Sequence, residues 1–249
     1  MPVFFGRFMA LIEEFEKTGN WLFRKRSYLP LILFVIATIT IYFERNEFAD
    51  SSDLLFSLFC IFISLFGLII RIVAIGFAQK NTSGRNVEGQ VADSLNTKGI
   101  YSVMRHPLYF GNLFMWLGVV IYVANFWLII VVILLFWIYY ERIMFAEEGY
   151  LRNKFGEEYI NWSSQTPAFI PIIRKWNKPL TQFNFKDVIR REYYGLTALA
   201  VSYAYINFIK NYFYKGEPRL DHVWLYVLVL AIIMFFVLRF LKKKTNVLK

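Results

Sequence analysis

The stretch PLYFGNLFMWLGVVIYVANFWLIIVVILLFWIYY, residues 107–140, decides the fold of this chain. It consists of two apolar runs, Pro107 to Ala124 and Phe126 to Tyr140, which are separated by Asn125 alone. A helix of about 20 mostly apolar residues crosses the hydrocarbon of a membrane, and somewhat fewer suffice where aromatic residues lie at the interfaces. The stretch therefore predicts two membrane-spanning helices that are joined as a tight hairpin.

The composition of the whole chain is that of a membrane protein. Of its 249 residues, 57% are hydrophobic and 20% aromatic, and the mean hydropathy of +0.43 is too high for a soluble chain of this length. Four further runs are apolar enough to span a membrane, and Arg71 interrupts the second of them. The sequence predicts an all-α, polytopic membrane helix bundle with about six transmembrane helices. The four further runs are residues 28–43, 54–78, 193–209 and 223–240.

An amphipathic helix is expected before the first span, over residues 1–26. Such a helix lies along the membrane interface with its apolar stripe toward the lipid. The segment does not resemble a signal peptide, because glutamates follow its apolar part without a small-residue cleavage site. The chain as a whole is predicted to form a single membrane domain, residues 1–249. The apolar stripe at helical spacing consists of Phe4, Phe8, Leu11, Ile12 and Phe15.

The charges of the loops predict the orientation, since Lys and Arg are retained on the cytoplasmic side of a membrane. Basic residues at positions 24–26 precede the first predicted span, whereas four acidic residues and one arginine follow it at positions 44–53. Three lysines at positions 242–244 follow the last span. Both termini are therefore expected in the cytoplasm, together with segments 80–106 and 141–192.

The net charge of +10 does not indicate a nucleic-acid-binding protein, because Lys and Arg are scattered among the segments that flank the membrane. Anionic lipid headgroups are the expected partners of these charges. With one cysteine, Cys60, and two histidines, the chain cannot assemble a zinc site from the usual ligands. No metal site is predicted.

A polar and aromatic string, GIYSVMRHPLYFGN at residues 99–112, leads into the hairpin. Pro107 suits the first turn of a helix, and it biases His106 away from helical dihedral angles. We expect the string to bend there and to present His106 and several aromatic rings to one pocket. For the tyrosines alone, an aromatic belt at the membrane interface is the alternative explanation.

An acidic pair, Glu147 and Glu148, follows the hairpin by about two helical turns. Charges so close to hydrocarbon need partners or water, because an unpaired charge there is costly. The two glutamates either belong to the predicted site or form an ordinary solvated helix with Arg152 and Lys154.

Together these strings resemble the isoprenylcysteine carboxyl methyltransferase family and its bacterial relatives. More distantly, they resemble phospholipid methyltransferases and the carboxyl-terminal halves of sterol reductases. The similarity covers residues 55–173 as a methyltransferase-like core, and it leaves residues 174–249 as a C-terminal extension of two helices. An RHPxYxG string followed by EExxL and FGxEY at this separation is specific. The matching residues are 97–101, 105–109, Gly111, Glu147, Glu148, Leu151, 155–159, Pro167 and Pro171.

This resemblance implies an all-helical membrane enzyme that binds S-adenosylmethionine on its cytosolic face. The enzyme would methylate an acceptor that is a membrane lipid or is anchored by one. Its cofactor pocket is implied by the position of the motifs, and one residue is added from the segment that precedes them. These cofactor-binding residues are Tyr101, His106, Pro107, Leu108, Tyr109, Glu147 and the added Asn96.

An arginine is expected to orient the acceptor. In the family's carboxyl methyltransferases, an arginine that faces the substrate stands four residues before the first glutamate of the pair, and here that position is Ile143. Arg142 is the nearest arginine to this position, and Arg105 lies within the motif. A guanidinium can bind a carboxylate or a phosphate through two hydrogen bonds. Arg142 and Arg105 are therefore the predicted catalytic residues.

The expected acceptor is an acidic lipid group, and the extension and the basic cytosolic segments favour a lipid phosphate such as the 1-phosphate of lipid A. Prenylcysteine carboxylate and an amine-bearing phospholipid are the alternatives among methyltransferases. A sterol-reductase relative that binds a nicotinamide cofactor and a non-catalytic membrane scaffold are the alternatives outside them. The length of 249 residues favours a methyltransferase, because the reductases are usually longer and have more spans.

Overall fold

The computed structural model describes residues 10–44, 54–79, 82, 90–245 and 248. The elements in this part of the chain are helices, which confirms the predicted all-α bundle. Short helical turns are η1 (Leu29–Leu31), η2 (Ile100–Ser102), η3 (Ile173–Lys175) and η4 (Asn211–Lys215). The α-helices are α1 (Leu11–Lys25), α2 (Ile32–Phe43), α3 (Leu54–Gly76), α4 (Pro107–Val123), α5 (Phe126–Phe155), α6 (Glu157–Gln165), α7 (Phe185–Lys210) and α8 (His222–Lys244).

Helices occur at all six predicted spans, but they differ in length and in apolar character. Three of them, α3, α5 and α8, are long and apolar enough to cross a membrane. α2 and α4 are apolar but shorter, with 12 and 17 residues. α7 has 26 residues and carries charged side chains in its first turns. The structure therefore supports a membrane helix bundle, whereas the crossings by α2, α4 and α7 stay predictions.

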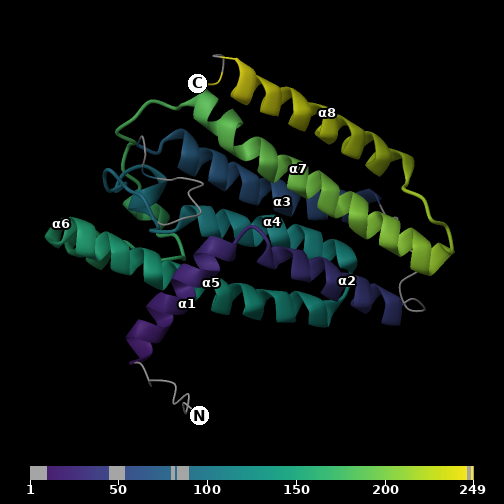
Figure 1. The fold of residues 1–249 in the computed structure, drawn as a ribbon, viewed down its shortest axis with the longest axis horizontal. Helices are drawn as coiled ribbons and strands as arrows, with labels where there is room; N and C mark the ends of the chain where they lie inside the picture. Colours follow the sequence, from purple (N-terminus) through teal and green to yellow (C-terminus); the bar gives the residue numbers. More distant parts are fainter. Residues whose placement is uncertain (1–9, 45–53, 80–81, 83–89, 246–247, 249) are drawn as a thin grey trace, which may run out of the picture.

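Most helices run along the long dimension of the bundle (Figure 1). α3 and α4 pack against each other in the middle, α7 and α8 cover one side, and α2 and α5 lie on the other. α1 crosses α5 obliquely, and α6 projects from the end of the bundle at which α1 begins and α8 ends (Figure 1). The hairpin of α4 and α5 is as tight as predicted, since only Ala124 and Asn125 separate the two helices.

α3 and α4 approach closely because two glycines face each other across their contact. A Cβ atom added at Gly111 would lie 2.7 Å from the carbonyl oxygen of Gly67, and one at Gly67 would overlap the carbonyl of Gly111. Small residues let helix backbones pack within a membrane, where the hydrophobic effect does not drive helices together. Ser64 ties α7 to this pair, because its hydroxyl is 2.9 Å from the Met115 carbonyl oxygen and 2.9 Å from the Tyr203 hydroxyl.

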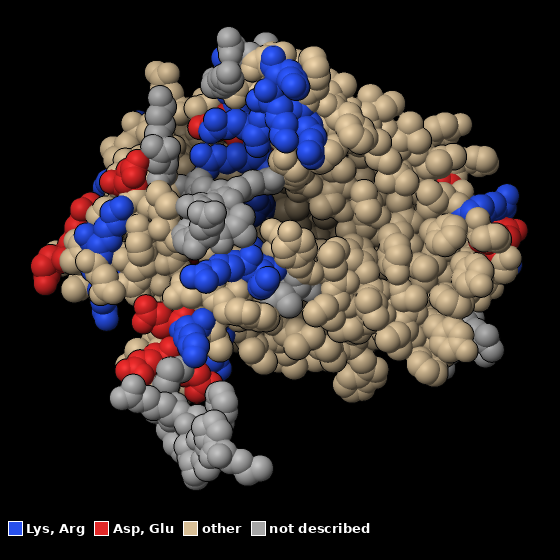
Figure 2. Space-filling model, in the orientation of Figure 1, with Lys and Arg blue, Asp and Glu red and all other residues tan. Residues whose placement is uncertain are grey.

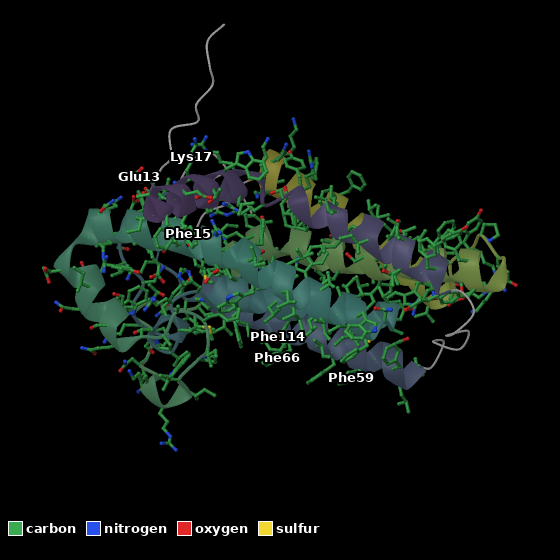
Figure 3. All side chains as sticks on the ribbon, turned by 90° about the horizontal axis from the view of Figure 1, so that it is seen from below. Glu13, Phe15, Lys17, Phe59, Phe66 and Phe114 are labelled. Carbon is green, nitrogen blue, oxygen red and sulfur yellow. The ribbon has the colours of Figure 1, made fainter. Side chains whose placement is uncertain are left out.

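The outer surface of the bundle is largely apolar. Phe59 and Phe66 on α3 and Phe114 on α4 project along one outer face (Figure 3). Phe59 is 54% exposed and Phe66 is 42% exposed. A large apolar surface is unfavourable in water and is matched by lipid tails. This face therefore suits contact with the hydrocarbon of a membrane.

The amphipathic helix expected over residues 1–26 corresponds to α1, and Phe4 and Phe8 of its predicted stripe lie outside the described residues. Phe15 points from α1 toward α5 (Figure 3) and packs edge-on against Phe145, with 5.6 Å between ring centroids. The two stripe residues at the start of α1 are exposed. Part of the stripe therefore contacts the bundle, and the interfacial position of α1 stays a prediction.

The contact of Gly67 with α4 predicts that Gly67→Ala destabilises the protein. The added methyl group meets a backbone carbonyl, which cannot rotate away, so α3 and α4 must separate. Overpacking of this kind typically costs about 1–3 kcal/mol, and we expect a lower melting temperature in detergent. The matched control is Gly149→Ala in α5, where nothing lies within 4 Å of the added atom. An equal effect of the two substitutions would contradict the packing described here.

Candidate functional site

The predicted bend lies immediately before α4. Pro107 is the first residue of that helix, and His106 has non-helical dihedral angles, φ −119° and ψ 59°. The backbone N–H groups of Arg105 and His106 donate to the carbonyls of Pro167 at 2.9 Å and Ala168 at 3.1 Å. The segment that follows α6 therefore holds the motif in its bent form.

A carboxylate of α5 joins the motif to the neighbouring helices. Glu148 accepts hydrogen bonds from Arg105 Nε at 2.8 Å, Arg105 Nη2 at 3.2 Å and His106 Nε2 at 2.8 Å. Arg105 Nη1 donates to the carbonyls of Ser163 at 2.8 Å and Thr166 at 2.7 Å. Charge-assisted hydrogen bonds are strong, so the motif, α5 and α6 form one unit. The guanidinium of Arg105 thus links parts of the protein, and its predicted role toward the acceptor stays a prediction.

The imidazole of His106 lies between two carboxylates. Its Nδ1 is 3.5 Å from Glu147 Oε2, and its ring stacks on Tyr109 with 5.7 Å between centroids. Burial by itself lowers the pKa of a histidine, but here the hydrogen bonds and charges of Glu147 and Glu148 outweigh burial and raise the pKa of His106 above 6.5. The protonated form is therefore favoured. The acidic pair belongs to the site, and the alternative of an ordinary solvated helix does not describe it.

A cavity of about 680 Å³ opens beside this unit, and its volume lies within the range of about 300–1,000 Å³ that is typical of ligand pockets. Its walls come from the motif, α5, α6 and residues 90–96, and it continues past α3 and α4 to the end of α1 and the start of α7. The structure brings all seven residues predicted to bind the cofactor to this one cavity, and that role stays a prediction. The seven are Asn96, Tyr101, His106, Pro107, Leu108, Tyr109 and Glu147.

Two aromatic residues of α6, Tyr159 and Trp162, also line the cavity. The indole Nε1 of Trp162 donates to the carbonyl of Tyr101 at 3.2 Å. Asn96 is held by the backbone N–H of Gln79, which donates to its Oδ1 at 3.0 Å. The FGxEY string marked Tyr159, whereas the sequence carried no signal that Trp162 would reach the same wall.

Arg142 does not line the cavity. Its guanidinium lies over the ring of Phe15, 3.5 Å from the centroid, and its Nη1 donates to Thr18 Oγ1 at 3.4 Å. A Cβ atom at Gly19 would overlap the backbone carbonyl of Arg142, so α1 and α5 are in close contact here. α1 covers the side of α5 from which Arg142 extends, and the acceptor-binding role of this arginine stays a prediction.

A buried polar network that sequence reasoning missed lies deeper in the cavity. Arg71 of α3 donates from Nε and Nη2 to both oxygens of Glu192 on α7, at 2.8 and 2.6 Å, and from Nη1 to Asn112 Oδ1 at 2.7 Å. Asn112 in turn donates to the hydroxyl of Tyr140 at 2.9 Å. One signal was available, since an ionisable residue inside an apolar span, such as Arg71, usually has a specific role. Glu192 stood outside the predicted spans and carried no such signal.

The raised pKa of His106 predicts that stability depends on pH. A group whose pKa is higher in the folded state contributes stability that is complete below its unfolded pKa, near 6.5, and is lost as the pH rises through the folded pKa. We expect the melting temperature in detergent to fall as the pH rises above this region. His106→Gln should flatten that profile, whereas His222→Gln, at the start of α8, should retain it. A decline of the same size in His106→Gln would refute the assignment.

The central region of the chain matches a known family. Residues 55–158 match the family described as phospholipid methyltransferase. The chain is 36% identical over 80 residues to the protein-S-isoprenylcysteine O-methyltransferase of Schizosaccharomyces pombe, covering 32% of this chain and 34% of the relative. It is 30% identical over 110 residues to protein-S-isoprenylcysteine O-methyltransferase B of Arabidopsis thaliana, covering 44% and 56%. The Xenopus laevis protein-S-isoprenylcysteine O-methyltransferase is 30% identical over 112 residues, covering 44% and 38%.

These matches cover only part of each protein. The chain spans between about a third and somewhat more than half of the length of these curated relatives, and no solved structure matches it significantly. The matched region contains α3, the bent motif, α4, α5 and the start of α6, whereas α1 and α7 lie outside it. The resemblance predicted from the motifs is therefore confirmed: the central region of the chain is similar to the phospholipid methyltransferase family and to isoprenylcysteine O-methyltransferases.

Proposed function

We propose that this protein is a membrane methyltransferase that uses S-adenosylmethionine and acts on an acidic group of a lipid or of a lipid-anchored acceptor. One observation carries this proposal, namely the shared cavity. The family's motif residues line it together with residues of α1 and α7, and the exposed Ala198 of α7 connects it to the outer surface of the bundle. A single space can thus bring a water-soluble methyl donor and a lipid-borne acceptor together.

The motif end of the cavity suits the methyl donor. It contains the carboxylate of Glu147 and the rings of Tyr101, Tyr109 and Trp162. A carboxylate pairs with an ammonium group, and aromatic faces attract cations such as a sulfonium. Because Glu148 is held by the motif, we assign the interaction with the donor to Glu147.

The proposed reaction needs placement more than it needs a base. S-adenosylmethionine supplies a methyl group on a positively charged sulfur, so an acceptor oxyanion can form the new carbon–oxygen bond with its own electron pair while the carbon–sulfur bond breaks. The products are a methyl ester and a neutral thioether, and no proton has to move. The residues of the cavity contribute by orienting the acceptor, and such placement can supply about 7–11 kcal/mol of the barrier reduction in favourable cases.

The names of the relatives support a carboxylate as the acceptor group, since these proteins are isoprenylcysteine O-methyltransferases. The lipid A 1-phosphate predicted from the sequence has no support from these relatives and stays a prediction. A phosphate and a carboxylate share the chemistry of an oxyanion on a hydrocarbon anchor. The proposal rests on that shared chemistry.

We propose further that the site faces the cytoplasm, with both termini on the same side. α1 begins and α8 ends at the end of the bundle that carries the site (Figure 1), and most of the charged side chains visible in Figure 2 gather there. Basic residues close the last turn of α8, at positions 242–244. The retention of Lys and Arg on the cytoplasmic side favours this orientation. A cytosolic methyl donor would then reach the cavity directly.

Substitution of Glu147 tests the assignment of the methyl donor. Glu147→Gln removes the charge but keeps the shape of the side chain, and loss of a charged hydrogen bond costs about 1.5–3 kcal/mol. We expect the dissociation constant of S-adenosylhomocysteine to rise at least about tenfold by calorimetry in detergent. Glu141→Gln, an exposed residue of the same helix, is the matched control. Unchanged affinity in Glu147→Gln would remove this residue from the donor site, and a response to NADPH instead would favour the reductase alternative.

Substitution of Arg142 distinguishes the packing role that the structure indicates from the acceptor-binding role that the motif spacing indicates. Because its side chain packs on Phe15 and outside the cavity, Arg142→Gln should retain S-adenosylhomocysteine binding and methyl transfer. Its melting temperature should fall, since the contact between α1 and α5 is weakened. Transfer of a labelled methyl group to membrane lipids is the measurement. Loss of transfer in a variant that melts normally would restore the acceptor-binding role inferred from sequence.

A further inference from the structure

Two basic residues from outside the motif also line the cavity. They are Arg26, directly after α1, and Arg191 of α7, and Gly195 and Ala198 of α7 line the wall as well. We propose that Arg191, with Arg26, binds the acidic headgroup of the acceptor, whose hydrocarbon chain lies along Gly195 and Ala198 and leaves the protein sideways into the lipid. This inference rests on the proposed function and names the residues that select its acceptor.

One face of α7 forms this part of the wall. Arg191, Gly195 and Ala198 are four and three residues apart, so they lie on the same side of the helix. The face thus carries a cation near its start and small residues farther along. Ala198 lines the cavity and is also exposed, so the cavity reaches the outer surface there. Figure 2 shows a hollow on one face of the bundle, with basic side chains on one side and uncharged surface on the other.

Both arginines act within the cavity. The guanidinium of Arg26 lies 3.7 Å from the centroid of the Phe23 ring, and its Nη1 donates to the Phe23 carbonyl at 3.3 Å, which holds it at the wall. Arg191 and Tyr101 line the same cavity. Burial and then Glu147 raise the pKa of Tyr101, and the charge of Arg191 opposes that rise. An acidic group placed between the two arginines would therefore lie close to the motif residues.

Two further arginines of the cavity wall, Arg71 and Arg105, bind carboxylates of the protein. Arg71 is held by both oxygens of Glu192, and Arg105 by both oxygens of Glu148. Separating a buried pair leaves an uncompensated charge, which is strongly unfavourable. Arg71 and Arg105 therefore act as positioning residues that shape the wall.

The cavity wall carries charges of both signs. Glu147 suits a cationic donor, whereas Arg26 and Arg191 suit an anionic acceptor. Methylation converts a carboxylate into a neutral ester and lowers the negative charge of a phosphomonoester by one, so the attraction of both arginines decreases. The same contacts that orient the acceptor therefore weaken once it is methylated, and the product can leave along α7 into the lipid.

α7 lies outside residues 55–158, the region that matches the family. The cation that we assign to the acceptor thus comes from the C-terminal extension. The motif spacing indicates an arginine at position 143, where the chain has Ile143. With Arg191 from α7, the chain would bind an oxyanion without an arginine at that position.

The test measures acceptor binding to the full-length protein in detergent, without any methyl donor. The two probes are an S-farnesylcysteine with a free carboxylate and a long-chain lipid phosphomonoester. Arg191→Gln should raise the dissociation constant of the probe that binds by about tenfold to a hundredfold, as expected for lost charge-assisted hydrogen bonds. Its affinity for S-adenosylhomocysteine should not change. The probe that shows the loss identifies the headgroup as a carboxylate or a phosphate.

Arg190→Gln is the matched control, because the neighbouring arginine pairs with Asp187 at 2.6 Å and does not line the cavity. It should bind both probes like the unchanged protein. If Arg191→Gln melts early, Arg191→Lys replaces it, since lysine keeps the charge but loses the guanidinium fork and should also weaken binding. Ala198→Phe should weaken the long-chain probe more than a short-chain analogue with the same headgroup.

Three results would overturn the inference. These are equal probe affinity in Arg191→Gln and the unchanged protein, an equal loss in Arg190→Gln, and failure of both oxyanions to bind the unchanged protein. A failure of the proposed function looks different, because the unchanged protein then does not bind S-adenosylhomocysteine at all.

Discussion

The carboxylate of Glu148 makes the interaction on which the rest of the site depends. It accepts hydrogen bonds from Arg105 and His106 at the same time, although the two partners precede it by 43 and 42 residues. Near hydrocarbon, a charge without a partner costs several kcal/mol, so each of these three groups is stable only while the others are in place. These contacts hold the bent motif against α5 and α6. Glu147, the residue before Glu148, lies at the wall of the cavity.

The same constraint explains the second ion pair, deeper in the bundle. Arg71 interrupts an apolar helix, and the bundle compensates it with Glu192 from α7 and with Asn112 from α4. The close approach of α3 and α4 at Gly67 and Gly111 allows these groups to meet. Packing and charge compensation are thus coupled, because a shift of α4 away from α3 would both open the interface and separate Arg71 from Asn112.

Some of the residues that line the cavity lie in the region that matches known proteins, and others lie outside it. The motif residues belong to the region that matches the phospholipid methyltransferase family, whereas α1 and α7, which also line the cavity, lie outside it. Relatives that share the central region can therefore hold the same kind of methyl donor and still differ in acceptor. Such a division follows from the proposed function, in which local motifs would bind the donor and helices at the lipid-facing surface would bind the acceptor.

The sequence by itself determined the helical bundle, the tight hairpin and the residues around the motif end, because these depend on apolar run length, on Pro107 and on local spacing. Only the tertiary structure decided which arginines face the cavity. Arg142 and Arg191 both stand beside apolar runs, yet α1 covers the first while α7 brings the second to the cavity wall. The physical reason is that the partner of a charge is set by neighbours in space, and Arg71 and Glu192 are 121 residues apart in sequence.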